Sequence, residues 1–179
     1  MTTLIEKIVA VHRSLDAAQV PYAFGGALAL AWCTKRARGT IDIDVNIFAT
    51  IDALDSVLAA LPDEVSATAA NRKELERDGQ SRLWWDKTPV DVFMNTTDFH
   101  EAASTRVRLH DFAGARVPFL GCTDLAVFKV FFDRTKDWAD LEEMWDAKSL
   151  DVERVVGVLA LYLGTDDHRL AKLLTLAAR

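Results

Sequence analysis

Two aspartates in the segment GTIDIDVNIF carry the strongest chemical signal in the chain. Asp42 and Asp44 are separated by one apolar residue within a run typical of a buried strand. Alternate residues of a strand share a face, so we expect both carboxylates to point together while Ile41, Ile43 and Val45 point into a core. Neighbouring carboxylates repel unless a proton or cation lies between them, and hard divalent cations prefer oxygen ligands. The pair predicts either a Mg²⁺ or Mn²⁺ site or a charged sheet edge that opposes aggregation.

Two further features belong with this pair. Asp91, in PVDVFM, also lies between apolar neighbours of an expected strand. Gly25 and Gly26, in FGG, end an expected strand and open a helix, where backbone N–H groups can approach a phosphate; a simple turn is the alternative. Three strand-borne acids beside a phosphate loop predict a nucleotide site.

The segment GGALALAWCTKRARGTIDIDV resembles the minimal nucleotidyltransferase signature. In that signature a strand ends in two small residues and, after a short helix, Arg-x-Thr-x-Asp-hydrophobic-Asp follows. The later VDV resembles the strand that supplies a third acid, at Asp91. The likeness is closest to AbiEii-type toxins and related bacterial nucleotidyltransferases of the DNA-polymerase-β-like superfamily. The matching positions are Gly25, Gly26, Arg38, Thr40, Asp42 and Asp44.

A second segment, TDLAVFKVFFDRTKDWADLEEM, is similar to the block that follows the sheet in these proteins. Lys129 falls within its apolar stripe, so we expect the ammonium group to meet a phosphate or an active-site carboxylate. The alternative is an ion pair with Asp137 or Asp140 that joins two helices, and we assign these two acids mainly to that role.

The resemblance implies a metal-dependent enzyme that moves a nucleoside monophosphate from an NTP substrate to an acceptor hydroxyl. Mg²⁺ or Mn²⁺ would be the cofactor, and Asp91 the general base. The implied catalytic residues are Asp42, Asp44, Asp91 and Lys129, of which the three acids bind metal. The implied phosphate-binding residues are Gly25, Gly26, Arg38 and Thr40.

The acceptor has two candidate classes. Resemblance to toxins suggests tRNA or another RNA within a toxin–antitoxin system, with a cognate antitoxin as partner, and the basic residues at 35–38 could contact a nucleic-acid backbone. A small acceptor, as in aminoglycoside nucleotidyltransferases, needs no basic patch. An inactive nucleotide-binding or partner-interaction module is the third alternative. Trp84 and Trp85 could stack on a base, although strand alternation places at least one of them in the core.

Composition narrows the class of protein. The chain has 179 residues, 50% of them hydrophobic and 27% charged, which excludes a disordered or low-complexity protein. A net charge of −6 argues against broad non-specific binding to nucleic acid.

No apolar run approaches the roughly 20 residues of a membrane helix, and we expect a cytoplasmic protein without membrane contact. Cys33 and Cys122 lack paired spacing, so we interpret them as buried, reduced thiols.

The elements that must position these residues indicate an α+β fold, with a nucleotidyltransferase-like mixed sheet flanked by helices and a C-terminal helical bundle. We expect a sheet domain over residues 1–120 and a helical region over 121–179 packed on it as one compact unit. The patterns over residues 63–80 and 98–110 are ambiguous, and SRLWWDK and VDVFMN are expected to pair through a tight turn at TP. The expected helices are 3–19, 27–36, about 50–61, 124–134, 137–147, 151–163 and 167–178, and the expected strands are 20–26, 41–48, 81–87, 90–95 and part of 114–122.

Overall fold

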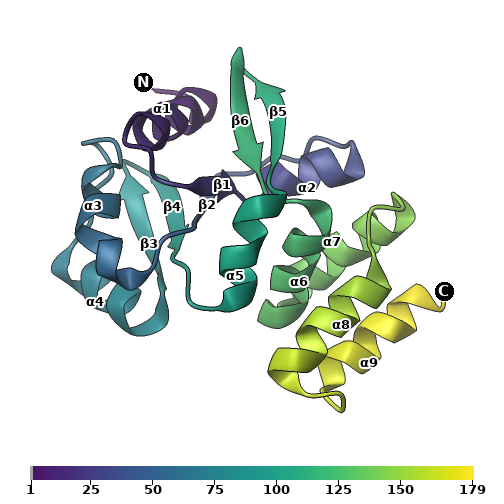
Figure 1. Ribbon diagram of the computed structural model, residues 1–179. Coiled ribbons are helices and arrows are strands. Elements are labelled where there is room, and N and C mark those ends of the chain that lie inside the picture. Colours follow the sequence, from purple (N-terminus) through teal and green to yellow (C-terminus); the bar gives the residue numbers. More distant parts are fainter. Residues whose placement is uncertain (1) are drawn as a thin grey trace. The chain divides into compact units, whose positions relative to one another are not determined.

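The computed structural model describes residues 2–179, which divide into two compact units (Figure 1). The first unit comprises the chain up to Leu28 together with Gly39–Leu120, and the second comprises Ala29–Arg38 and Gly121–Arg179. The first holds a mixed sheet with helices and the second is helical, so the predicted α+β fold class is confirmed.

The sheet of the first unit has six strands in the order β3-β4-β2-β1-β6-β5. Strand β2 runs parallel to β4 and antiparallel to β1, and β1 runs parallel to β6. Hairpins add the two edge strands, β3 on β4 and β5 on β6. The strands are β1 (Tyr22–Phe24), β2 (Ile43–Ile47), β3 (Gln80–Trp85), β4 (Thr88–Phe93), β5 (Arg108–Phe112) and β6 (Ala115–Phe119), and the helices of this unit are α1 (Leu4–Ala17), α3 (Leu54–Ala59), α4 (Ala69–Asp78) and α5 (Asp98–Ala103), with single 3₁₀ turns at Ile51–Ala53 and Ser104–Arg106.

One face of the sheet forms the core of the first unit. In β2 the residues Ile43, Val45 and Ile47 are buried, and Leu83 of β3 and Val90 of β4 are buried with them. The acids at 42 and 44 alternate with this apolar set, as the strand period requires. The expectation that Ile41 joins the core is wrong, because β2 begins only at Ile43 and the Ile41 side chain is 79% exposed.

Helices α1 and α4 attach to the β3–β4 hairpin. Ser81 is buried and donates its hydroxyl proton to Glu74 of α4, while the buried Lys7 ammonium of α1 donates to the carbonyl oxygen of Trp85. Helix α4 lies within the ambiguous range 63–80, where Thr68 forms a capping box. The edge hairpin is thereby fixed in register against the rest of the unit.

The tight turn between β3 and β4 is not at the predicted position. The strands pair Trp85 with Thr88, so Asp86 and Lys87 form the turn and the TP dipeptide belongs to β4. Asp86 has φ of 53°, a left-handed conformation that aspartate tolerates better than most residues. A proline is accepted in β4 at its second residue, near the strand end.

Helix α2 (Gly26–Thr34) begins in the first unit and continues into the second. The second unit is otherwise built from α6, α7, α8 and α9, which pack on one another. Their bounds are Cys122–Phe132, Thr135–Asp146, Val152–Leu163 and His168–Ala177, close to the predicted ranges. No helix within residues 2–179 is long and apolar enough to cross a membrane.

A disulfide links Cys33 of α2 to Cys122 of α6 within the second unit. The interpretation of both cysteines as reduced thiols is therefore wrong. The two residues are 89 positions apart in sequence, yet their Cα atoms are 5.6 Å apart, inside the range that a disulfide spans. Spacing along the chain gave no sign of this pair, because folding alone brings the two helices together.

Candidate functional site

The three predicted acids lie on one face of the first unit's sheet. Asp44 and Asp91 are direct partners across the parallel strands β2 and β4, and Asp42 immediately precedes β2. Directly paired residues of neighbouring strands project to the same side with about 5 Å between their Cβ atoms. The structure thus brings together Asp44 and Asp91, which lie 47 residues apart in the sequence.

An arginine outside the predicted set sits among these acids. Arg82 of β3 is the cross-strand partner of Asp91, and its guanidinium donates two hydrogen bonds to the two carboxylate oxygens of Asp91, each 2.7 Å long. The same guanidinium is 4.0 Å from Oδ2 of Asp42. Arg82 therefore links two of the predicted site acids.

The electrostatics of Arg82 include all three acids. The pKa of its guanidinium is raised above the usual value, first by the hydrogen bond to Asp91 and then by the negative charges of Asp91, Asp42 and Asp44, against a smaller opposing effect of burial. One guanidinium thus compensates part of the charge that three neighbouring carboxylates concentrate on this face.

Thr40 holds the Asp42 carboxylate. Its hydroxyl donates to Oδ1 of Asp42, and the backbone N–H of Asp42 donates to the same hydroxyl oxygen over 3.3 Å. The predicted contact of Thr40 with phosphate stays a prediction. In the structure Thr40 orients a carboxylate in the turn that leads into β2.

Gly25 and Gly26 pass directly beside the Asp44 side chain. The backbone N–H of Gly25 donates to the carbonyl oxygen of Asp44 over 2.9 Å. Gly26 has φ of +49°, and a Cβ atom built on it would lie 1.8 Å from Oδ2 of Asp44. Only glycine leaves room for this carboxylate at the first residue of α2, where the helix dipole favours a negative charge.

The donor set suits a hard divalent cation, although the carboxylates are not gathered around a common point. Within residues 2–179 no group of three or more His, Cys, Asp or Glu side chains is arranged to hold a metal ion. The carboxylate oxygens of Asp44 and Asp91 on one sheet face are ligands of the kind that Mg²⁺ or Mn²⁺ prefers. The guanidinium of Arg82, bound to both oxygens of Asp91, occupies the carboxylate that would complete the set.

Lys129 takes part in a buried charge network of the second unit. Its ammonium group donates to Asp140 over 2.6 Å and lies 3.6 Å from Asp137, and both acids are almost fully buried. Arg38 pairs with Asp140, and Arg134 pairs with Asp137. The assignment of Asp137 and Asp140 to fixing α6 on α7 is confirmed. The roles of Lys129 and Arg38 at phosphate stay predictions.

The tandem tryptophans point to opposite faces of β3. Trp85 is buried and Trp84 is 44% exposed, which confirms that at least one is a core residue. By strand alternation Trp84 shares the face of Arg82. A base-stacking role for Trp84 stays a prediction.

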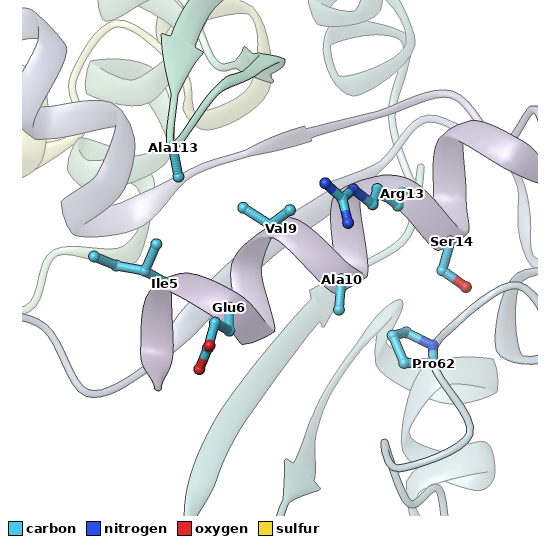
Figure 2. Close-up of a pocket in the computed structure, with 8 residues that line it drawn as sticks. All are labelled: Ile5, Glu6, Val9, Ala10, Arg13, Ser14, Pro62 and Ala113. Atoms are coloured by element: carbon cyan, nitrogen blue, oxygen red, sulfur yellow. The ribbon is translucent and has the colours of Figure 1, made fainter. Parts of the chain in front are cut away.

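A pocket along α1 contains none of the predicted site residues. Figure 2 shows Ile5, Glu6, Val9 and Arg13 along α1, and Pro62 and Ala113 line the pocket from other segments of the chain. This pocket is mostly apolar and carries no cluster of acids. The predicted acids Asp44 of β2 and Asp91 of β4 do not line it.

The hairpin register was the signal that could have identified Arg82. With a two-residue turn at Asp86 and Lys87, counting back along both strands places Arg82 opposite Asp91. A turn at TP shifts that count and moves the arginine away from the acid. Because the turn was predicted at the wrong position, the pairing of Arg82 with Asp91 was not predicted. Within the described residues of β3 and β4, this is the only cross-strand contact between a basic side chain and a predicted site acid.

Comparison of the sequence with known protein-family models finds no match, and comparison with curated proteins finds none. The structure is similar to the solution structure of the antibiotic-resistance factor ANT(2'')-Ia, at 16% identity and a TM-score of 0.62, over 90% of this chain and 91% of that one. It is also similar to crystalline ANT(2'')-Ia in complex with adenylyl-2''-tobramycin, at 15% identity and a TM-score of 0.52, over 99% and 94% of the two chains. At such identities the likeness shows the fold alone, which is nucleotidyltransferase-like.

Proposed function

We propose that this protein transfers a nucleoside monophosphate from a nucleoside triphosphate to an acceptor hydroxyl, using Asp42, Asp44 and Asp91. One observation carries the proposal: the three carboxylates share one sheet face, with the Gly25–Gly26 turn beside Asp44. The nucleotidyltransferase-like fold supports the reaction class.

Asp42, Asp44 and Asp91 would hold Mg²⁺ or Mn²⁺, because carboxylate oxygens are the ligands that these ions prefer. When bound, such a cation neutralises phosphate charge and lowers the pKa of a coordinated hydroxyl. Thr40 keeps Asp42 oriented toward the site, and the open backbone at Gly26 keeps space for Asp44. The chain contributes mainly position and charge.

In the proposed step the acceptor oxygen forms a bond to the α-phosphorus while the bond from that phosphorus to the bridging oxygen breaks. Pyrophosphate leaves with the electron pair of the broken bond, and the hydroxyl proton passes to a carboxylate oxygen. Asp91 is our candidate for that base. Arg82 donates one hydrogen bond to each oxygen of Asp91, so the proton goes to a lone pair that the guanidinium does not use.

Two acceptor classes remain candidates. The net charge of −6 favours a small, cationic acceptor. Arg38, one of the basic residues predicted to contact RNA, is paired with Asp140, which also argues for a small acceptor. The complex of ANT(2'')-Ia with adenylyl-2''-tobramycin is the precedent on this fold. RNA, with a role beside an antitoxin, is the second candidate, supported by exposed Lys35 and Arg36.

Label transfer tests the proposal. The purified protein is incubated with each α-³²P-labelled NTP and Mg²⁺, against either total RNA or a panel of aminoglycosides, and products are resolved by gel or thin-layer chromatography. Asp44→Asn is expected to abolish transfer, whereas Asp52→Asn, at an exposed acid of the same unit, is expected to leave it unchanged. Label in only one acceptor pool identifies the acceptor class.

An inactive module would give a different result. Absence of label in every pool, together with no calorimetric binding of any Mg²⁺–NTP, would overturn the enzyme and leave a protein-interaction role. Binding of NTP without transfer to either pool would retain the nucleotide site and exclude both acceptor classes.

A further inference from the structure

We infer that Arg82 competes with the divalent cation for Asp91 and thereby sets the metal affinity of the site. This inference rests on the proposed function, because it concerns the same three acids. Arg82 is assigned as a positioning residue: it acts on the reaction through the carboxylate that it holds.

The contact geometry is the first argument. Arg82 forms a two-pronged pair with Asp91, with Nε donating to Oδ1 and Nη2 donating to Oδ2, each over 2.7 Å. This is the strong, planar form of the arginine–carboxylate interaction. Both oxygens of Asp91 that a cation would use therefore already accept a hydrogen bond from Arg82.

Charge is the second argument. Arg82 is also 4.0 Å from Asp42, so its positive charge faces two of the acids at contact distance. A carboxylate has lone pairs to spare for a second partner, but a guanidinium and a divalent cation on the same carboxylate repel each other at this range. This repulsion weakens binding of the cation as long as Arg82 stays on Asp91.

Exposure shows which partner moves. The Asp91 side chain is 17% exposed, and its residue is fixed by strand pairing on both sides, to β2 and to β3. The Arg82 side chain is 50% exposed on edge strand β3, so its guanidinium can turn into solvent on a flexible stem. The carboxylate stays in place while the guanidinium leaves it.

Direct titration with Mn²⁺, without nucleotide, tests this competition by calorimetry and electron paramagnetic resonance. Arg82→Gln removes the charge and is expected to tighten Mn²⁺ binding about tenfold or more, the scale of one unit charge at such a distance. Arg77→Gln is the matched control, since Arg77 forms a similar two-pronged pair with Asp78 on α4. It is expected to bind Mn²⁺ as the wild type does, and Asp44→Asn is expected to lose binding.

Thermal melting separates competition from a purely structural ion pair. We expect Arg82→Gln to melt below the wild type without metal, because three carboxylates lose their counter-charge, and to gain more from added Mn²⁺ than the wild type does. If this variant does not fold, Arg82→Lys keeps the charge but loses the planar fork, and its Mn²⁺ affinity is expected to exceed that of the wild type.

Equal Mn²⁺ affinity in Arg82→Gln, Arg77→Gln and the wild type, with Asp44→Asn defective, would overturn the inference and leave the proposed function standing. If Arg82→Lys is the variant measured, an affinity equal to that of the wild type overturns the inference in the same way. If Asp44→Asn binds Mn²⁺ with the affinity of the wild type, and no label transfer is observed, both the proposed function and the inference are overturned.

Discussion

Replacement of Gly26 by alanine is the sharpest test of how the glycine turn and the acids depend on each other. The residue has φ of +49°, which costs an alanine about 1 to 2 kcal/mol. The new Cβ would lie 1.8 Å from Oδ2, 2.5 Å from Cγ and 3.1 Å from Cβ of Asp44. Rotating the carboxylate relieves the first two contacts but not the third, so the backbone must also shift.

Forced overpacking of this kind costs roughly 1 to 3 kcal/mol. Together with the backbone strain we expect a loss of about 2 to 5 kcal/mol, which for a chain of this size lowers the melting temperature by roughly 5 to 15 °C. Because the displaced group is Asp44, Mn²⁺ binding should fall together with stability. Calorimetric melting and Mn²⁺ titration of the same sample measure both effects.

Two other glycines provide matched controls. Gly114 has φ of +81° with open space around its Cβ position, so its alanine variant reports strain alone. Gly79 has φ of +68° and a Cβ position 2.1 Å from the Thr96 side chain, so its variant combines strain and clash away from the acids. Both should keep Mn²⁺ binding. If Gly26→Ala melts like the wild type and binds Mn²⁺ equally well, the assigned dependence of Asp44 on a glycine at this position is refuted.

The remaining predictions concern stability. Cys122→Ser, which opens the link to Cys33, should cost about 2 to 4 kcal/mol in urea unfolding, and dithiothreitol should lower the melting temperature of the wild type but not of the variant. Asp140→Asn leaves the buried Lys129 poorly compensated and should cost about 3 kcal/mol in urea unfolding. Burial lowers the pKa of His100 from 6.5 to about 4, against a weaker opposing backbone hydrogen bond, so about 2 kcal/mol should be lost in urea unfolding between pH 7 and pH 5.

The sign of the histidine effect follows from protonation of the unfolded chain. Below pH 6.5 unfolded His100 takes up a proton that the folded protein accepts only near pH 4, so stability is full above the unfolded pKa and falls as the pH drops through this window. His100→Phe, beside Phe48, should remove this contribution to the dependence of the unfolding free energy on pH. An unchanged pH dependence in the variant would contradict the role given to His100.

For Asp140, the control is Glu142→Gln on the same helix, whose exposed pair with Arg179 should contribute less than about 1 kcal/mol to stability. Equal losses in these two variants would show that burial does not decide the cost.

Local patterns in the sequence determined much of the secondary structure. The apolar stripes of α6 to α9 and the strand alternation around Asp44 come from residues near one another in the chain, and these elements lie close to their predicted ranges. The alternation of Asp42 and Asp44 with the buried Ile43 and Val45 is also local, because side chains along a strand repeat with a period of two, whereas Asp91 joins them only through the pairing of β4 with β2. Helix α4 was missed because its residues are mostly polar, and its capping box at Thr68 was the remaining signal.

Tertiary structure alone decided which side chains compensate the acids. The contact of Arg82 with Asp91 depends on the register of the β3–β4 hairpin. When the turn is predicted two residues too late, Arg82 is no longer placed opposite Asp91. The Cys33–Cys122 disulfide and the pairing of Arg38 with Asp140 join residues 89 and 102 positions apart, and no periodicity encodes such separations. Periodicity determines which face of a strand or helix a residue occupies, whereas its partner depends on how separate elements pack, and that packing is set by the free energy of the whole fold.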